Sequence, residues 1–217
     1  MRQYLLRVHR IRRKKNGRKH SKDIRIPNRV DIAKRPKIVE KRKQFGHQEG
    51  DNMVYNQYRR ALSTTAKHKT RKVMIFRPRD LTAQAKACLT IYRYRTLPPE
   101  ARRTMTYDNG LKAATHETVT ATVGMKFYFV KTYASWQRGI NENRNGPVRF
   151  YLPRDADPDS VSDAEIKRIK NLINNRPMKC LGYQTPNEAY KDEINKLYQR
   201  SLRSNIKNFY PWVALVN

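Results

Sequence analysis

Apolar and β-branched residues gather in short runs over the first part of the chain. Polar connectors separate three such runs, a pattern typical of strands joined by turns. The predicted strands cover residues 51–55, 61–66 and 72–76. Three successive strands with short connectors favour an antiparallel meander, in which Asp51 lies on the first, central strand.

Helical and strand-like periodicities alternate after this meander. Apolar residues recur at helical spacing from Leu81 to Tyr92, and Asp80 is placed to act as the N-cap of that helix. The elements predicted here are a helix at 81–94, a strand at 103–107, a helix at 113–123 that stops at Gly124, and a strand at 125–130. The alternation predicts an α/β fold, with a mixed sheet and helices packed on it.

A further helix is predicted to begin after Ser135, which is placed to cap it. Trp136 and Ile140 are expected to face the sheet from this helix. Pro147 is expected to end or kink it, because a proline inside a helix costs about 3 kcal/mol.

Two more helices follow. They are predicted at 163–173, capped by Ser160 or Ser162, and at 187–197. Leu181 and Tyr183, between these helices, are expected to be packing residues. The aromatic stretch at 209–212 either docks on the core or mediates association, and the sequence leaves both readings open.

Charge narrows the class of partner. The 217 residues have room for one sizeable core plus an arm or tail, and they carry a formal net charge of +30. Such an excess points to a polyanion, with nucleic acid favoured over an anionic membrane surface. No apolar run of about 18 residues suggests a membrane span, and no signal peptide is visible. The isolated Cys88 and Cys180, and the scattered histidines, do not indicate a zinc site.

The first 43 residues hold 18 lysines and arginines but only three acidic residues. A segment of this composition buries too little apolar surface to order itself in isolation. The simplest interpretation is a solvated arm, and the functional one is an arm that binds DNA phosphates without reading sequence. Its candidate phosphate-binding residues are Arg12, Arg13, Lys14, Lys15, Arg18 and Lys19.

Two acidic residues frame the most informative stretch of the chain. Asp108 comes directly after a predicted strand, and Glu142 follows 34 positions later inside a predicted helix. Carboxylate oxygens are the ligands that Mg²⁺ and Mn²⁺ prefer, and two such ions can hold the reacting oxygens of a phosphodiester. By themselves two acidic residues are more often solvated surface groups than metal ligands.

The residues around these acids form three blocks in order. The blocks are Phe-Gly-His-Gln-Glu-Gly-Asp at 45–51, Thr-Tyr-Asp-Asn-Gly at 106–110 followed by Ser-Trp-Gln-Arg-Gly-Ile-Asn-Glu-Asn-Arg-Asn-Gly at 135–146, and Asn-Asn-Arg-Pro-Met-Lys-Cys-Leu-Gly-Tyr-Gln-Thr-Pro at 174–186. Over about residues 20–190 the chain resembles bacterial transposases of the insertion sequence thirty group, which carry a retroviral-integrase-type Asp-Asp-Glu core.

The resemblance implies a ribonuclease-H-like fold, with a five-stranded mixed sheet and helices on both faces. It implies that Asp51, Asp108 and Glu142 are catalytic and bind two Mg²⁺ (or Mn²⁺) ions per active site. The expected activity is DNA strand cleavage and strand transfer on element ends and target DNA, by a homo-oligomer on double-stranded DNA. The expected location is the bacterial cytoplasm, in association with the nucleoid, with no membrane partner.

On this basis we divide the chain into a basic arm and linker at 1–44, a catalytic core at 45–192, and a helix end with an aromatic tail at 193–217. The family's helix-turn-helix region is expected to be missing, since the sequence leaves no room for it. Gln48 stands where the family usually has tryptophan. Arg138 is assigned either a DNA phosphate or a surface pair with Glu142.

Two alternatives to a catalytic transposase remain open. A basic DNA-binding protein without catalysis, such as a truncated transposase product, explains the charge equally well. A structure-selective nuclease of the same fold explains the carboxylates but not the blocks around Trp136 and Arg176. Metal-dependent cutting separates the first rival from a transposase.

Overall fold

The computed structural model describes residues 26–55, 60–78, 80, 82–108, 115–131 and 139–209, without the side chains of 139–142 and 204–209. The six arm residues from Arg12 to Lys19, as well as Ser135, Trp136 and Arg138, lie outside these ranges. Across the described ranges, no helix combines the length and apolar character that crossing a membrane requires.

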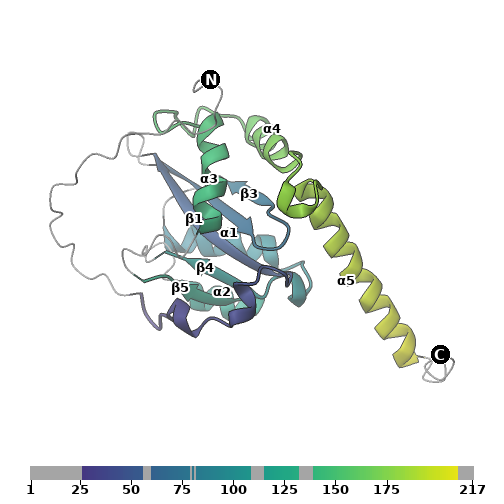
Figure 1. Ribbon diagram of the computed structural model, residues 1–217. Helices are drawn as coiled ribbons and strands as arrows, with labels where there is room; N and C mark the ends of the chain where they lie inside the picture. The colour runs from purple at the N-terminus through teal and green to yellow at the C-terminus, as the bar shows by residue number, and fades with distance from the viewer. Residues whose placement is uncertain are drawn as a thin grey trace.

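One mixed sheet forms the centre of the molecule (Figure 1). Its strands are β1 (His47–Tyr55), β2 (Arg60–Lys67), β3 (Val73–Phe76), β4 (Thr104–Tyr107) and β5 (Lys126–Phe129), in the order β3-β2-β1-β4-β5. β1 pairs antiparallel with β2, and β2 with β3, whereas β4 lies parallel to both β1 and β5. The predicted meander and the central position of β1 are therefore confirmed.

Helices cover both faces of the sheet, as the fold class predicts (Figure 1). The helices α1 (Ala83–Tyr94) and α2 (His116–Val123) pack on one face, where they bury Ala87, Tyr94, Val119 and Val123 against β4 and β5. The helices α3 (Gly139–Tyr151) and α4 (Asp163–Asn174) pack on the other face, against the first three strands. A sheet with an apolar layer on each side is the arrangement that buries both of its faces.

Hydrogen bonds from side chains set several helix ends. Thr82, and not Asp80, is the N-cap of α1, because its hydroxyl accepts from the amide of Ala85. Asp80 accepts instead from the amide of Thr82, one residue before the helix. The end of α2 at Gly124 is confirmed, with φ of 74°, a left-handed conformation that glycine adopts without steric cost. Ser162 caps α4.

The prediction that Pro147 ends or kinks its helix is wrong about the ending. α3 continues through Pro147 to Tyr151, and the amide of Leu152 still donates to the carbonyl of Val148. Both Val148 and Leu152 are buried in the core under α3. Burial of two such side chains stabilises by roughly 3–6 kcal/mol, which offsets the cost of one proline.

The last helix is also longer than predicted. α5 (Pro186–Phe209) continues twelve residues beyond 197, and Figure 1 shows much of its length extending away from the sheet. Its first turns attach to the core through the Tyr190 ring, which lies 5.6 Å from that of Phe45. The packing role predicted for Tyr183 is wrong, since this residue is 71% exposed.

The segment before the sheet is partly packed rather than fully extended. It forms two short 3-10 helices, η2 (Ile32–Lys34) and η3 (Lys37–Val39), with Val39 fully buried. Two more 3-10 helices, η5 (Pro99–Ala101) and η8 (Lys179–Leu181), precede β4 and α5. Asp31 bridges to Phe129, so this segment lies along the outer edge of β5.

Candidate active site

The two predicted aspartates lie on neighbouring parallel strands. β1 and β4 pair as His47 with Thr104, then one by one up to Glu49 with Thr106. The same register, continued by two residues, brings Asp51 opposite Asp108, just past the end of β4. Neighbouring strands are about 4.8 Å apart, so the two carboxylates start from adjacent backbone positions.

Strand alternation puts both carboxylates on the α3 face of the sheet. Asp51 shares its side of β1 with Met53 and Tyr55, which pack in the core under α3 and α4. Asp108 follows Tyr107, which packs in the opposite core with α1 and α2. Side chains of successive residues point to opposite faces, so Asp108 is aligned with Asp51.

The position of the Tyr107 ring explains why a glycine, Gly50, precedes Asp51. A Cβ atom at Gly50 would lie 2.2 Å from Cε1 of the Tyr107 ring, so no other residue fits without displacing that ring. Burial raises the pKa of the Tyr107 hydroxyl, and the charges of Tyr94, Asp108 and Asp51 raise it further. Both aspartates are thus close to a single buried ring that spans the two strands.

Asn145 connects α3 to Asp51 through a hydrogen bond. Its Nδ2 donates to Oδ2 of Asp51 at 2.6 Å, and its Oδ1 accepts from the hydroxyl of Thr64 at 2.9 Å. Thr64 is the cross-strand partner of Asp51 on β2. This contact is not predicted by the sequence, although the three-residue spacing between Glu142 and Asn145 puts both on one side of a helix.

Glu142 lies in α3, one turn before Asn145, and its side chain is outside the described residues. Among the side chains that the structure describes, no three acidic, histidine or cysteine residues gather to hold a metal ion. The three-carboxylate site therefore stays a prediction. Two of its members are aligned by the sheet register, and the helix of the third is fixed over Asp51.

Arg149 is a second residue near Asp51 that no sequence pattern indicated. It lies four positions after Asn145 on α3, with its guanidinium 4.4 Å from the centroid of the Tyr55 ring and Nη2 donating to the carbonyl of Val54. Burial lowers the pKa of Arg149, while the nearby Tyr55 and Asp51 oppose that change. A cation is thus held on the same face as the Asp51 carboxylate.

Behind the site, the other face of β1 carries a buried polar cluster around Gln48. The Oε1 atom of Gln48 accepts from Nζ of Lys67 and from the hydroxyl of Tyr94, each at 2.8 Å. All three side chains are almost fully buried, and burial followed by the charge of Lys72 lowers the pKa of Lys67 to about 7. Glutamine at this position is therefore a structural hydrogen-bonding residue.

Comparison with solved structures defines the class of fold. The chain is similar to the catalytic core domain of BIV integrase, with a TM-score of 0.54 and 16% sequence identity, over 70% of this chain and 98% of that one. The core is thus a ribonuclease-H-like, integrase-type fold.

Sequence comparison supplies the family. No family model matches the chain. It is 40% identical over 182 residues to the transposase for insertion sequence element IS4351 of Bacteroides fragilis, covering 84% of this chain and 56% of that protein. It is 32% identical to the transposase InsI for IS30C of Escherichia coli, covering 86% and 49%.

A third relative is the transposase for insertion sequence element IS1086 of Cupriavidus metallidurans, which is 33% identical over 83% of this chain and 53% of its own length. The chain spans about half the length of the curated relatives it matches. Over the matched residues, it belongs to the insertion-sequence transposases of the IS30 family and its relatives.

Proposed function

We propose that this chain is a transposase core that cleaves DNA strands and joins them to target DNA in a metal-dependent reaction. The observation that carries the proposal is the alignment of Asp51 with Asp108 on parallel strands, under a helix that holds Glu142 and contacts Asp51 through Asn145. The relatives that match the chain are all named transposases, which supports the same chemistry.

Asp51, Asp108 and Glu142 would hold two Mg²⁺ or Mn²⁺ ions. The oxygen donors fit such hard cations, and two of the three groups start from one rigid sheet. When bound, these ions stabilise negative charge on the oxygens that attack and leave the phosphorus.

The remaining residues of the site position these groups. Asn145 fixes the orientation of the Asp51 carboxylate, because its amide nitrogen donates to one carboxylate oxygen. The hydroxyl of Thr64 donates to the side-chain oxygen of Asn145 and so fixes the amide itself. Arg149 supplies a positive charge near Asp51, suited to a phosphate of the bound strand.

The partners in this proposal are double-stranded element ends and target DNA, bound by a homo-oligomer in the nucleoid of a bacterial cytoplasm. The net charge of +30 supports a nucleic-acid partner. The basic arm and Arg138 are assigned to DNA backbone contacts on sequence grounds.

The test is nicking and strand transfer of labelled duplex DNA by the purified chain with Mg²⁺, Mn²⁺ or a chelator. We expect cutting that needs the metal and that disappears in Asp108→Asn and Glu142→Gln, while both variants still bind DNA. Undiminished cutting by Asp108→Asn contradicts the site. Salt-sensitive binding without cutting under either metal favours a DNA-binding protein without catalysis.

A further inference from the structure

The last helix continues well beyond its contacts with the core. The ring of Tyr190 lies 5.6 Å from that of Phe45, and Glu193 forms an ion pair with Lys69 at 2.7 Å. The described side chains of α5 continue to Arg203, and after Glu193 none of them forms a hydrogen bond or ion pair with the core. Figure 1 shows this part of α5 extending away from the sheet. The second half of α5 thus has no polar attachment to the core among the described residues.

This half of α5 carries apolar residues on one side. Ile194, Tyr198 and Leu202 follow one another at four-residue spacing, which places them at neighbouring positions on one face of a helix. Tyr198 is 56% exposed and Leu202 is 55% exposed. An apolar stripe on an otherwise polar helix is the side that packs against another element. The exposure of Tyr198 and Leu202 shows that the described residues leave much of this stripe uncovered.

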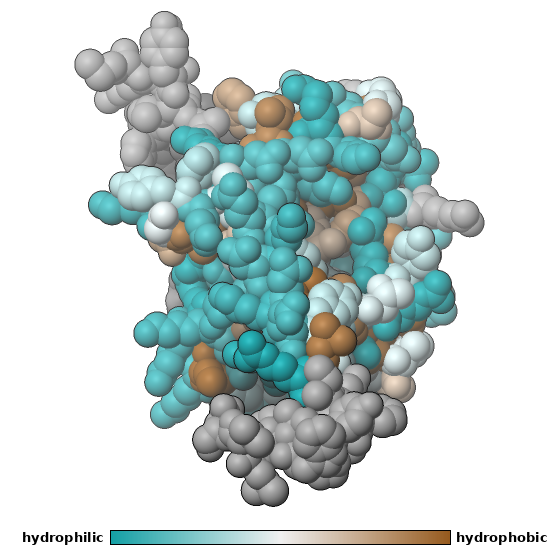
Figure 2. Space-filling view, turned by 90° about the vertical axis from the view of Figure 1, so that its right-hand side faces the viewer, coloured by the Kyte–Doolittle hydropathy of each residue, from teal (hydrophilic) through white to brown (hydrophobic). Residues whose placement is uncertain are grey.

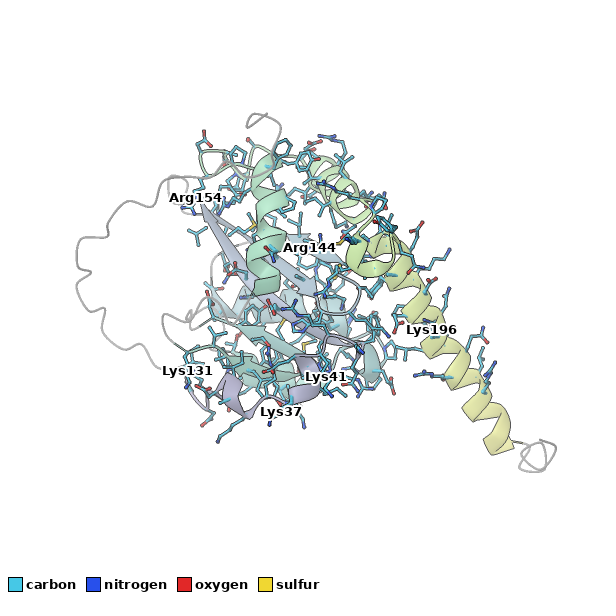
Figure 3. All side chains as sticks on the ribbon, viewed as in Figure 1. Lys37, Lys41, Lys131, Arg144, Arg154 and Lys196 are labelled. Carbon is cyan, nitrogen blue, oxygen red and sulfur yellow. The ribbon has the colours of Figure 1, made fainter. Side chains whose placement is uncertain are left out.

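The opposite side of the same half is basic. Lys196, labelled in Figure 3, shares that side with Arg200 and Arg203, at four- and three-residue spacing. Of these three cations, only Lys196 has a described acidic neighbour, which is Glu193 of the same helix at 3.2 Å. The acidic residues of α5 all come before Ile194, and they are Glu188, Asp192 and Glu193. The helix is therefore acidic in its first part and basic in its second.

A partner for this half of α5 has to match both its apolar stripe and its charge. A helix that stands alone in water is marginally stable, because most helical stability in proteins comes from packing an apolar face. The side of the molecule from which α5 projects is mainly hydrophilic, with apolar residues in small separate patches (Figure 2). The same helix of a second copy supplies an equal stripe. Only an antiparallel arrangement also brings the basic part of one helix beside the acidic part of the other.

We propose that the second half of α5 pairs with the same helix of a second copy of this chain, antiparallel and about a two-fold axis near Tyr198. Such an axis places Ile194 level with Leu202 of the second copy, and Arg203 beside the stretch that holds Asp192. One surface then serves both copies, as a two-fold dimer requires. The inference rests on the proposed function for a homo-oligomer that acts on DNA, and it gives that oligomer a defined surface.

Duplex DNA is the other polyelectrolyte that the basic side of α5 suits. Phosphates would contact the cations alone and would leave Tyr198 and Leu202 in water. A second copy buries these two side chains, and burial of apolar surface is the main favourable term in protein association. The exposed apolar stripe therefore favours the second copy, and variants of that stripe distinguish the two partners.

The test is sedimentation equilibrium of the full chain over a series of protein concentrations, without DNA and with a chelator present. Tyr198→Gln with Leu202→Gln changes the stripe. Tyr92→Gln with Leu172→Gln makes the same two chemical changes at exposed residues of α1 and α4. Glutamine has good helix propensity and adds no charge. Circular dichroism confirms that both double variants are folded.

We expect the wild-type chain and the control variant to form dimers with similar dissociation constants. The stripe variant is expected to raise the dissociation constant at least about 10-fold, because each lost apolar contact occurs twice in a two-fold dimer. A wild-type chain that stays monomeric at every concentration overturns the proposal, and so does a stripe variant that associates like the control.

Exchange of charges tests the antiparallel arrangement. Arg203→Glu places an acidic residue beside the acidic part of the second copy, and Asp192→Lys places a lysine beside the basic part. Each is expected to weaken dimerisation about two- to tenfold at low salt. The double variant should return toward wild type, because the attraction is restored with the signs exchanged. A double variant weakened by the product of the two single effects contradicts the antiparallel pairing.

DNA and metal separate this inference from the catalytic proposal. A chain that dimerises through the stripe but never cuts DNA with metal retains the interface and loses the proposed activity. A chain that cuts DNA as a monomer loses the interface alone. If α5 is protected from proteolysis by duplex DNA and not by a rise in protein concentration, the helix is assigned to DNA and the second copy is overturned.

Discussion

The two faces of β1 hold their polar side chains in different environments. On the α3 face, Asp51 is only partly buried and is held by the amide of Asn145. On the α1 face, Gln48 and Lys67 are buried and hold each other, together with Tyr94. One face keeps a charged group available for chemistry, whereas the other buries a polar cluster that fixes the strand.

The comparison shows that neighbouring residues of one strand differ in what a substitution should do. Changes at Asp51 and at the side chains that hold it are expected to alter catalysis with little effect on folding. Changes on the α1 face are expected to alter stability, because each buried polar atom there has a specific partner.

The largest effect is expected at Gly50, which lies against the Tyr107 ring. Gly50→Ala is expected to destabilise the fold by about 3 kcal/mol, since the added methyl group would lie 2.2 Å from that ring. Urea unfolding measures the loss. The double variant with Tyr107→Val should recover much of it, and a Gly50→Ala chain as stable as wild type would contradict the close approach.

Asn145→Ala is expected to lower the rate of metal-dependent cleavage 10- to 100-fold, because the Asp51 carboxylate loses the group that orients it. The melting temperature should change little, since Asn145 lies at the partly exposed edge of the site. Asn145→Asp serves as the matched variant, as it keeps the size but adds a charge beside Asp51. Equal cleavage by wild type and Asn145→Ala would remove Asn145 from the site.

Lys67 is expected to make stability depend on pH. Its pKa of about 7 in the folded protein is below its ordinary value of 10.5, so the unfolded chain binds more protons between these two values. Stability contributed by this group therefore rises as the pH increases from about 7 to about 10, and the cost of burying the charge is fully present below pH 7.

Lys67→Met is expected to be more stable than wild type at pH 6 by at least about 1.4 kcal/mol, the equivalent of one pKa unit, and to lose that advantage toward pH 10. Chemical unfolding at several pH values measures this. Lys69→Met, a more exposed lysine paired with Glu193, should show no such crossover. A constant difference between wild type and Lys67→Met would mean that Lys67 is not titrating there.

The smallest effect is expected at Thr64, whose hydroxyl donates to Asn145 and thereby supports the hydrogen bond from Asn145 to Asp51. Thr64→Val removes one hydrogen bond to the Asn145 carbonyl, worth about 1 kcal/mol, and should slow cleavage about fivefold. Thr64→Ser, which keeps the hydroxyl, should behave like wild type in the same assay. A Thr64→Val chain as slow as Asn145→Ala would show that Thr64 acts on Asp51 by another route.

Local sequence determined most of the secondary structure and the positions of the two aspartates. The short β-prone runs became β1, β2 and β3, and the helix that ends at Gly124 has the predicted stop. These features depend on neighbours in the chain or on the periodicity of one element, and therefore are readable from the sequence.

Tertiary packing decided the rest. α3 runs through Pro147 because Val148 and Leu152 are buried beneath it. That burial depends on tertiary packing and cannot be inferred from the residues next to Pro147 in the sequence. Asn145 reaches Asp51 across 94 positions of sequence, and Asn174 exchanges hydrogen bonds with the backbone of Val73 across 101 positions. The sequence by itself predicted which residues carry the proposed chemistry. Only the folded sheet, through its register and the helices packed on it, decided which of them stand together.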